Sequence, residues 1–185
     1  AAGVPFAPAR IVHDGAEAVE AAGELGYPVV LKALGRLHKS DAGGIVVGLR
    51  DAEELRRAVL DVAERLSPPA FSVEAAEDTA AGFELLVGAR RDPRFGPVVL
   101  VAAGGVHTEI LRDTAFALAP VGAADAERLL LSLSSAPLRA GARGRAPLDV
   151  AAAAEAVAAL SRFAAAHPEI AEVEVNPLLV RAAGA

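Results

Sequence analysis

The 185-residue sequence contains no cysteine, no methionine and no tryptophan, and aromatic residues make up only 4% of it. The absence of cysteine excludes disulfide bonds and thiolate chemistry. The apolar runs are far too short to span a bilayer, and no charged segment followed by an apolar one begins the chain. We therefore expect a cytoplasmic protein without membrane contacts. Because even position 1 is not methionine, we also expect a fragment or a processed chain.

The residues that are abundant point to a soluble globular protein. Hydrophobic residues make up 54% of the sequence, and many of them are alanine, so we expect a core of small aliphatic side chains. The net charge of −6 argues against a general affinity for nucleic acid, which requires a basic face. Local basic residues can still bind a nucleotide.

Hydrophobic periodicity and capping residues predict helices and strands in mixed order. We expect helices at 14–25, 51–66, 123–133 and 149–166. We expect strands at 9–12, 29–33, 45–49, 71–75, 83–89, 98–102, 115–119, 170–175 and 178–180. Strand neighbours in the middle of the chain favour the α+β class over regular βαβ repeats. A shift in composition near residue 97 suggests two lobes.

The stretch from Lys32 to Gly44 is unlike a packed core, since it combines two ammonium groups, an imidazole and two adjacent glycines. Lys32 follows an apolar strand, where a lysine either binds phosphate or lies at a sheet edge with its ammonium in water. Gly43 and Gly44 allow backbone N–H groups to approach an anion. His38 is a candidate nucleophile for a phosphorus centre, although a lone loop histidine is more often simply exposed.

Two further strands carry candidate polar residues. Alternation places Glu84 on one face of its strand, where a carboxylate either accepts hydrogen bonds from ribose hydroxyls or faces solvent. Glu172, Glu174 and Asn176 share one face of theirs, and Asn176-Pro177 is expected to end that strand. Carboxylate and amide oxygens suit Mg²⁺, while a polar edge strand is the structural alternative.

Five segments together give the sequence a family resemblance. They are Gly26–Lys32, Leu37–Gly44, Glu84–Gly88, Arg91–Pro97 and Glu172–Leu178. Each is weak alone, but their order along nearly the whole chain is specific. The sequence resembles the ATP-grasp domain of NDP-forming (ADP-forming) acyl-CoA synthetases, the acetate–CoA ligase group.

The resemblance implies an ATP-grasp fold in which two α+β lobes hold the nucleotide between them. We place the N-terminal (lid) lobe at 14–96 and the C-terminal lobe at 1–13 and 97–185. Lys32, Gly43 and Gly44 are then expected at the phosphates of ATP or ADP, and Glu84 at the ribose. Residues 74–77 are expected along the adenine, and Glu174 and Asn176 at Mg²⁺.

The resemblance also implies a reaction. His38 corresponds to a loop histidine that carries phosphate between ADP and a distant phosphohistidine, coupled to acyl-CoA synthesis or cleavage. The loop between Lys32 and His38 is shorter than the common family form, and no aspartate follows Asn176 to complete the metal site.

CoA-binding and phosphohistidine domains are expected partners, on a longer chain or another subunit, and apolar surface left without them favours a homo-oligomer. A different function is left open, because similar domains form non-catalytic regulatory regions of protein acetyltransferases.

Overall fold

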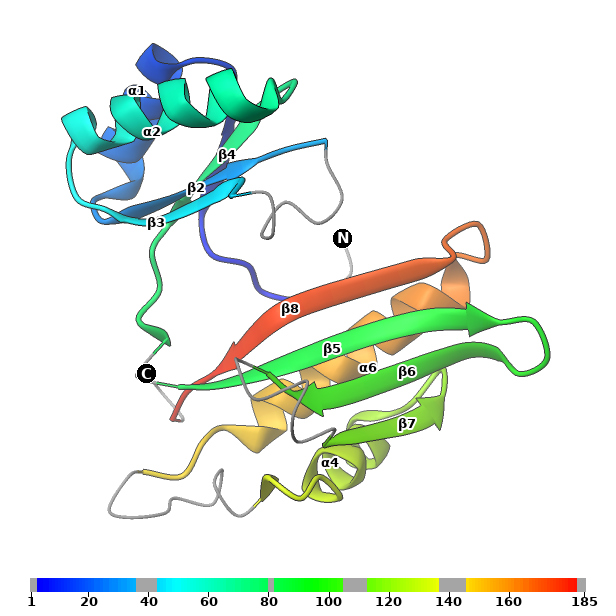
Figure 1. The fold of residues 1–185 in the computed structure, drawn as a ribbon. Coiled ribbons are helices and arrows are strands. Elements are labelled where there is room, and N and C mark those ends of the chain that lie inside the picture. The colour runs from blue at the N-terminus through cyan, green and yellow to red at the C-terminus, as the bar shows by residue number, and fades with distance from the viewer. Residues whose placement is uncertain (1–2, 36–42, 80–81, 105–112, 137–145, 183–185) are drawn as a thin grey trace. The chain divides into compact units, whose positions relative to one another are not determined.

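The computed structural model describes residues 3–35, 43–79, 82–104, 113–136 and 146–182. The chain divides into two compact units, each described by itself below (Figure 1). The first unit comprises residues 6–77, and the second comprises residues 1–5 and 78–185. No helix in the described ranges is long and apolar enough to cross a membrane.

The first unit is a four-stranded antiparallel sheet with two helices on one face (Figure 1). Its elements in chain order are β1 (Ala9–Val12), α1 (Gly15–Leu25), β2 (Val29–Ala33), β3 (Ile45–Leu49), α2 (Ala52–Leu66) and β4 (Phe71–Ala75). The strand order is β1-β4-β2-β3. The core between sheet and helices contains Leu31 and Val73 from the strands and Leu55 from α2. Alternate strand residues therefore remain on an uncovered face.

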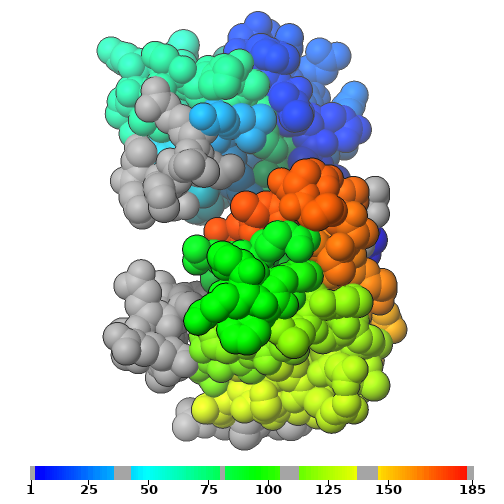
Figure 2. Space-filling view, turned by 90° about the vertical axis from the view of Figure 1, so that its right-hand side faces the viewer, coloured from blue at the N-terminus to red at the C-terminus, as the bar shows by residue number. Residues whose placement is uncertain are grey.

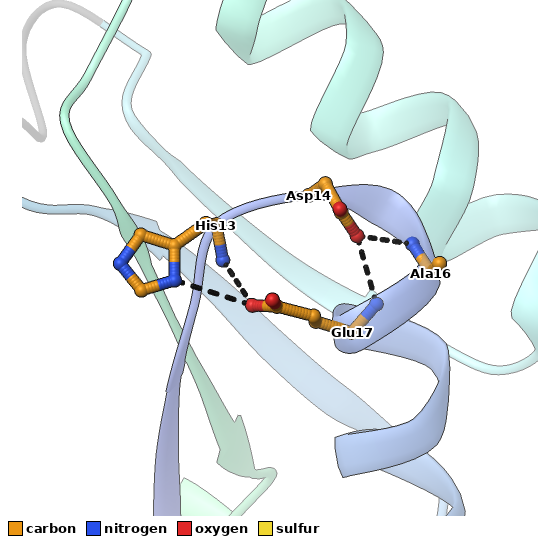
Figure 3. Close-up of polar contacts among 4 residues, drawn as sticks. All are labelled: His13, Asp14, Ala16 and Glu17. Atoms are coloured by element: carbon orange, nitrogen blue, oxygen red, sulfur yellow. Dashed lines mark hydrogen bonds and ion pairs between the residues drawn. The ribbon is translucent and has the colours of Figure 1, made fainter.

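Both helices of this unit begin with a reciprocal capping arrangement. At α1, Asp14 accepts hydrogen bonds from the amides of Ala16 and Glu17, while the Glu17 carboxylate accepts one from the His13 amide at 2.8 Å (Figure 3). The same carboxylate also lies 3.2 Å from the His13 ring. These contacts satisfy amides that have no partner within the helix. His13 is thereby explained as part of a helix start.

The second unit is also a four-stranded antiparallel sheet covered by helices on one face (Figure 1). Its elements are β5 (Phe83–Asp92), β6 (Gly96–Ala103), β7 (Thr114–Leu118), α4 (Ala123–Leu131), α6 (Val150–Ala166) and β8 (Glu172–Val180). The strand order is β7-β6-β5-β8. Its core joins β5 and β6 residues such as Leu85 and Val101 to Leu130 of α4 and Val157 of α6. Each unit thus has a hydrophobic core of its own.

The prediction that Asn176-Pro177 ends its strand is wrong. β8 continues to Val180 and pairs with β5 on both sides of that dipeptide, with a shift in register between the pairs Leu85–Leu178 and Val87–Val175. β8 is an edge strand, and an edge strand tolerates a proline because one side of its backbone needs no partner. Between these two pairs β8 contains one residue more than β5. The side chains that face the core are therefore Val173 and Val175 before the shift, and Leu178 and Val180 after it.

The α+β class is confirmed, but the units differ from the expected lobes in two segments. β1 pairs with β4, so residues 9–12 belong to the first unit and not to the C-terminal lobe. β5 pairs with β6 and β8, so the boundary falls after Glu77 and not after residue 96. The start of β8 lies beside the turn end of the β5–β6 hairpin, where Glu172 is opposite Arg90 (Figure 2). Both differences from the expected lobes follow from pairing between strands that are far apart in the sequence.

Candidate functional site

Lys32 lies near the end of β2, on the face of the first sheet that the helices leave uncovered. Its neighbours Leu31 and Ala33 point into the core, so its own side chain points the other way. The Lys32 Nζ donates to Glu74 Oε2 at 2.6 Å, and the Ser72 hydroxyl donates to Glu74 Oε1 at 3.0 Å. Both charged side chains are partly buried, with 33% of Lys32 and 22% of Glu74 exposed. Glu74 thus holds the Lys32 ammonium, and Ser72 in turn holds the Glu74 carboxylate.

Apolar side chains surround this polar group on the same sheet face. Opposite pairing places Ile11 of β1 beside Ser72, and Ile45 of β3 beside Lys32. Ile11 and Val47 are 69% and 71% exposed, which is unusual for such large apolar residues on a sheet. The uncovered face therefore offers one ammonium and one carboxylate among aliphatic side chains. This combination suits a ligand with an aromatic ring and an anionic group.

The loop predicted to bind phosphate begins and ends at well-defined points. The Ala33 amide donates to the Gly44 carbonyl at 2.7 Å and closes the base of the loop between β2 and β3. Gly43 has a φ of +67°, a conformation that side chains other than glycine rarely adopt. Lys32, Gly43 and Gly44 are thus gathered at one end of the β2–β3 hairpin. His38, the predicted catalytic residue, lies outside the described residues.

Glu84 lies on β5 in the second unit, on the sheet face opposite α4 and α6. Its neighbours Phe83 and Leu85 pack into the core, which turns the Glu84 carboxylate to the uncovered face. The Gly104 amide donates to the Glu84 carbonyl at 2.7 Å, and a Cβ atom at Gly104 would lie 2.9 Å from that carbonyl group. Only glycine permits this close approach, so Gly104 holds the Glu84 backbone in place.

Glu174 and Asn176 are exposed on β8, as the predicted alternation requires. Glu174 is paired with Gly88 of β5, so it shares the uncovered face with Glu84. The described residues contain no cluster of three or more acidic, histidine or cysteine side chains that could hold a metal alone. One carboxylate and one amide oxygen nevertheless fit Mg²⁺, which commonly takes its other ligands from phosphates and water.

The structure thus places the predicted residues in two sets, each within its own unit. Lys32, Gly43 and Gly44 belong to the first unit, and Glu84, Glu174 and Asn176 to the second. Sequence reasoning missed the Glu74 side chain as the partner of Lys32, and the Ser72 hydroxyl as a donor to that carboxylate. Their alternation in Phe71–Ala75 was the available signal, because it separates two polar residues from apolar Phe71 and Val73.

Comparison with known proteins adds a family to this geometry. A sequence profile described as an ATP-grasp domain matches residues 1–185. The beta subunit of an ADP-forming acetate–CoA ligase I from Pyrococcus furiosus is 36% identical over 183 residues, which cover 95% of this chain and 79% of that subunit. An ADP-forming 4-hydroxybutyrate–CoA ligase from Nitrosopumilus maritimus is 36% identical over 98% of this chain but only 27% of its own length.

A solved structure extends the comparison to the fold. The dinucleotide-forming acetyl-coenzyme A synthetase 1 of Ca. Korarchaeum cryptofilum superposes with a TM-score of 0.82 at 37% identity, covering 97% of this chain and 80% of that one. That structure is a complex with coenzyme A and Mg-AMPPCP, and its phosphohistidine segment points towards the nucleotide-binding site. The similarity covers both units described above.

Proposed function

This chain belongs to the ATP-grasp family, and from that premise we propose that it is the nucleotide-binding and phosphoryl-transferring domain of an ADP-forming acyl-CoA synthetase. The observation that carries the proposal is the Lys32 ammonium on an uncovered sheet face, held by Glu74 beside the Gly43–Gly44 end of a loop. The relatives described above are acid–thiol ligases, which does not favour a regulatory role in a protein acetyltransferase.

In the proposed role, the chain binds ATP or ADP. Lys32 and the backbone of Gly43 and Gly44 contact the phosphates, and Glu84 accepts hydrogen bonds from the ribose hydroxyls. Glu174 and Asn176 would hold Mg²⁺, which would supply neutralisation of the charge that develops during transfer. Residues 74–77 lie along the adenine. In this proposal the first unit serves as the lid lobe, and the second unit serves as the C-terminal lobe.

His38 is the proposed phosphate carrier. In the direction that consumes ATP, a ring nitrogen of His38 forms a bond to the γ-phosphorus as the bond to the bridging oxygen breaks, and ADP leaves. The phosphate then passes to a phosphohistidine segment and finally activates the acyl group for CoA. Those segments belong to a longer chain or another subunit, as do the CoA contacts. Self-association of the chain and a cytoplasmic location remain part of the proposal.

Nucleotide binding is tested by titration calorimetry with Mg·ADP. Lys32→Ala removes the only lysine of the first sheet, and we expect it to weaken binding at least about tenfold, as loss of a charged hydrogen bond does. Arg57→Ala is the control, because Arg57 is an exposed cation of the same unit paired only with Glu53 in the described contacts. Equal affinity of the Lys32 variant and the unaltered chain would remove Lys32 from the site.

Phosphoryl transfer is tested with ATP labelled in its γ-phosphate. We expect acid-labile label on the unaltered chain and on His13→Ala, whose ring serves the start of α1. His38→Ala should carry none. Label that persists in His38→Ala, or its absence from the unaltered chain in the presence of Mg²⁺, contradicts the carrier role.

A further inference from the structure

β7 is an edge strand of the second sheet, and its outer side is open (Figure 1). The Ala119 amide donates to the Pro97 carbonyl at 2.8 Å, so the backbone groups at this end of β7 turn to β6. Because these directions alternate along an antiparallel strand, Thr114, Phe116 and Leu118 direct their N–H and C=O groups outward. No other described residue forms a backbone hydrogen bond with those outward groups.

The same three residues turn their side chains to the uncovered face of the sheet. Ala115 and Ala117, which lie between them, pack against the core on the other face. Phe116 is 61% exposed and Leu118 is 60% exposed. Pairing with β6 places Leu100 opposite Phe116 on the same face. Large apolar side chains therefore border the open edge.

β7 differs in composition from the other three edge strands of the two sheets. β8 carries Glu174 and Pro177, and β1 carries Arg10. In β3 the backbone is interrupted by Gly48, which has a φ of +71°. Charges, prolines and irregular backbone hinder pairing with another chain, and they commonly protect sheet edges. Thr114–Leu118 contains no charged residue, no proline and no glycine, so its own sequence does nothing to prevent pairing.

The strand is also complementary to itself. If two copies of β7 pair antiparallel through their outward groups, Phe116 lies opposite Phe116 of the second copy, and Thr114 lies opposite Leu118. Every opposite pair is uncharged, and the two phenylalanine rings meet at the two-fold axis, where an aromatic cross-strand pair is stabilising. The chain as a whole carries a net charge of −6, which makes copies repel each other. Contact through β7 brings no like charges together.

We propose that a second copy of this chain binds at β7, and that antiparallel pairing of the two β7 strands joins two four-stranded sheets into one continuous sheet. Such a contact uses the same strand of both copies and leaves no open β7 edge, so assembly ends at a dimer. The inference gives a location to the self-association that forms part of the proposed function, but it does not depend on nucleotide binding.

Sedimentation equilibrium measures the association, and we expect a concentration-dependent dimer for the unaltered chain. Phe116→Lys places two ammonium groups opposite each other and should raise the dissociation constant at least about tenfold. Phe95→Lys is the matched control, because Phe95 is 62% exposed in the same unit but lies outside β7, and this variant should dimerise as the unaltered chain does. An equimolar mixture of Phe116→Lys and Phe116→Glu should regain the dimer, since opposite charges then meet.

Because the chain contains no cysteine, introduced cysteines can test the register of the pairing. In the proposed pairing the Cα atoms of residue 116 in the two copies lie about 5.5 Å apart, within the range of a disulfide. Phe116→Cys should therefore give a cross-linked dimer under mild oxidation. Thr114→Cys should not, because the same residue of the second copy lies about 14 Å away along the strand. A mixture of Thr114→Cys and Leu118→Cys should cross-link, since these positions are opposite each other.

Several results would overturn the inference. A chain that stays monomeric at concentrations up to about 1 mM has no such contact, and a dimer that survives unchanged in Phe116→Lys forms elsewhere. Equal cross-linking of Phe116→Cys and Thr114→Cys would contradict the register, and assembly beyond the dimer would contradict the closed two-fold contact. Each of these results leaves the proposed nucleotide site standing, and failure of the chain to bind ADP would leave the dimer standing.

Discussion

The Lys32–Glu74 pair joins two partly buried charges, so a single substitution changes more than the proposed ligand contact. Removing the ammonium leaves the Glu74 carboxylate beside Ser72 without its cation, and such a residual charge is costly to bury. A double variant, Lys32→Ala with Glu74→Ala, removes both charges together. Its comparison with Lys32→Ala separates loss of the proposed phosphate contact from the effect of the unpaired carboxylate.

Gly104 is predicted to be intolerant of even one added methyl group. In Gly104→Ala the new Cβ would lie 2.9 Å from the Glu84 carbonyl oxygen and carbon, and backbone atoms cannot move aside as a flexible side chain can. We expect the free energy of unfolding to fall by about 2 kcal/mol, as for an overpacked site. Nucleotide binding should also weaken, because the displaced strand carries Glu84. Urea unfolding and calorimetry measure the two effects.

Gly23 provides the matched control for that substitution. It is an exposed residue of α1, and an added Cβ would meet no atom within 4 Å. Gly23→Ala should therefore raise stability by about 0.5–1 kcal/mol through the better helix propensity of alanine. Equal effects of the two substitutions would show that the contact between Gly104 and Glu84 is not tight.

At the scale of single elements, one carboxylate links the start of β7 to the chain after α4. Asp113 accepts hydrogen bonds from the amides of Ser134 and Ser135 at 2.6 and 2.8 Å. Burial raises the pKa of Asp113, but the hydrogen bonds from Ser135 and Ser134 lower it more, so that the pKa lies below its ordinary value. The charged form is thus favoured by folding.

Asp113→Ala should therefore destabilise the chain in a pH-dependent way. We expect a loss of about 1 kcal/mol at pH 7, comparable to removal of a helix cap. A lowered native pKa means that the unfolded chain binds more protons, so the contribution is present above the unfolded pKa of about 3.9 and disappears as the pH falls through the native value. Urea unfolding at pH 7 and pH 3 should show the difference between variant and unaltered chain shrinking.

Glu127 on α4 is a suitable comparison for Asp113. It is exposed, and the described contacts give its side chain no partner, so Glu127→Ala should change stability by less than about 0.5 kcal/mol at either pH. A constant destabilisation of Asp113→Ala from pH 7 to pH 3 would exclude a role for its charge.

Elements with local signals could be predicted from the sequence, whereas those decided by distant partners could not. Asp14 with Glu17 and Asp51 with Glu54 form the predicted capping arrangements, and both helices start after those aspartates. β5 extends to Asp92, three residues beyond the predicted end, because Arg90, Arg91 and Asp92 pair with β6. The same limit applies to the site. Lys32 stood out by its chemistry, but its bond to Glu74 spans 42 residues.

On the scale of the whole chain, two separate hydrophobic cores imply that each unit can unfold independently of the other. Leu55 is fully buried in the core of the first unit, and Leu130 is fully buried in that of the second. Leu55→Ala and Leu130→Ala should each cost about 2–5 kcal/mol. We expect each variant to raise amide hydrogen exchange only within its own unit, because cooperative unfolding follows the packed core.

Mass spectrometry of exchanged peptides provides the measurement, and the two leucine variants serve as controls for each other. If Leu55→Ala accelerates exchange in β5 and α6 as much as in β2 and α2, the chain unfolds as one cooperative body. Confinement to β1–β4 with α1 and α2 supports independent units.

The pairing of β1 with β4 has a consequence for how the first unit can be inherited and engineered. Ala9 is opposite Glu74, and the Ala75 amide donates to the Pro8 carbonyl at 3.0 Å, so the chain enters and leaves residues 6–77 at adjacent points. A segment whose two ends lie next to each other can be transplanted between host chains, or circularly permuted with a short linker. Recombination can therefore exchange the unit that carries Lys32 as a single piece of chain.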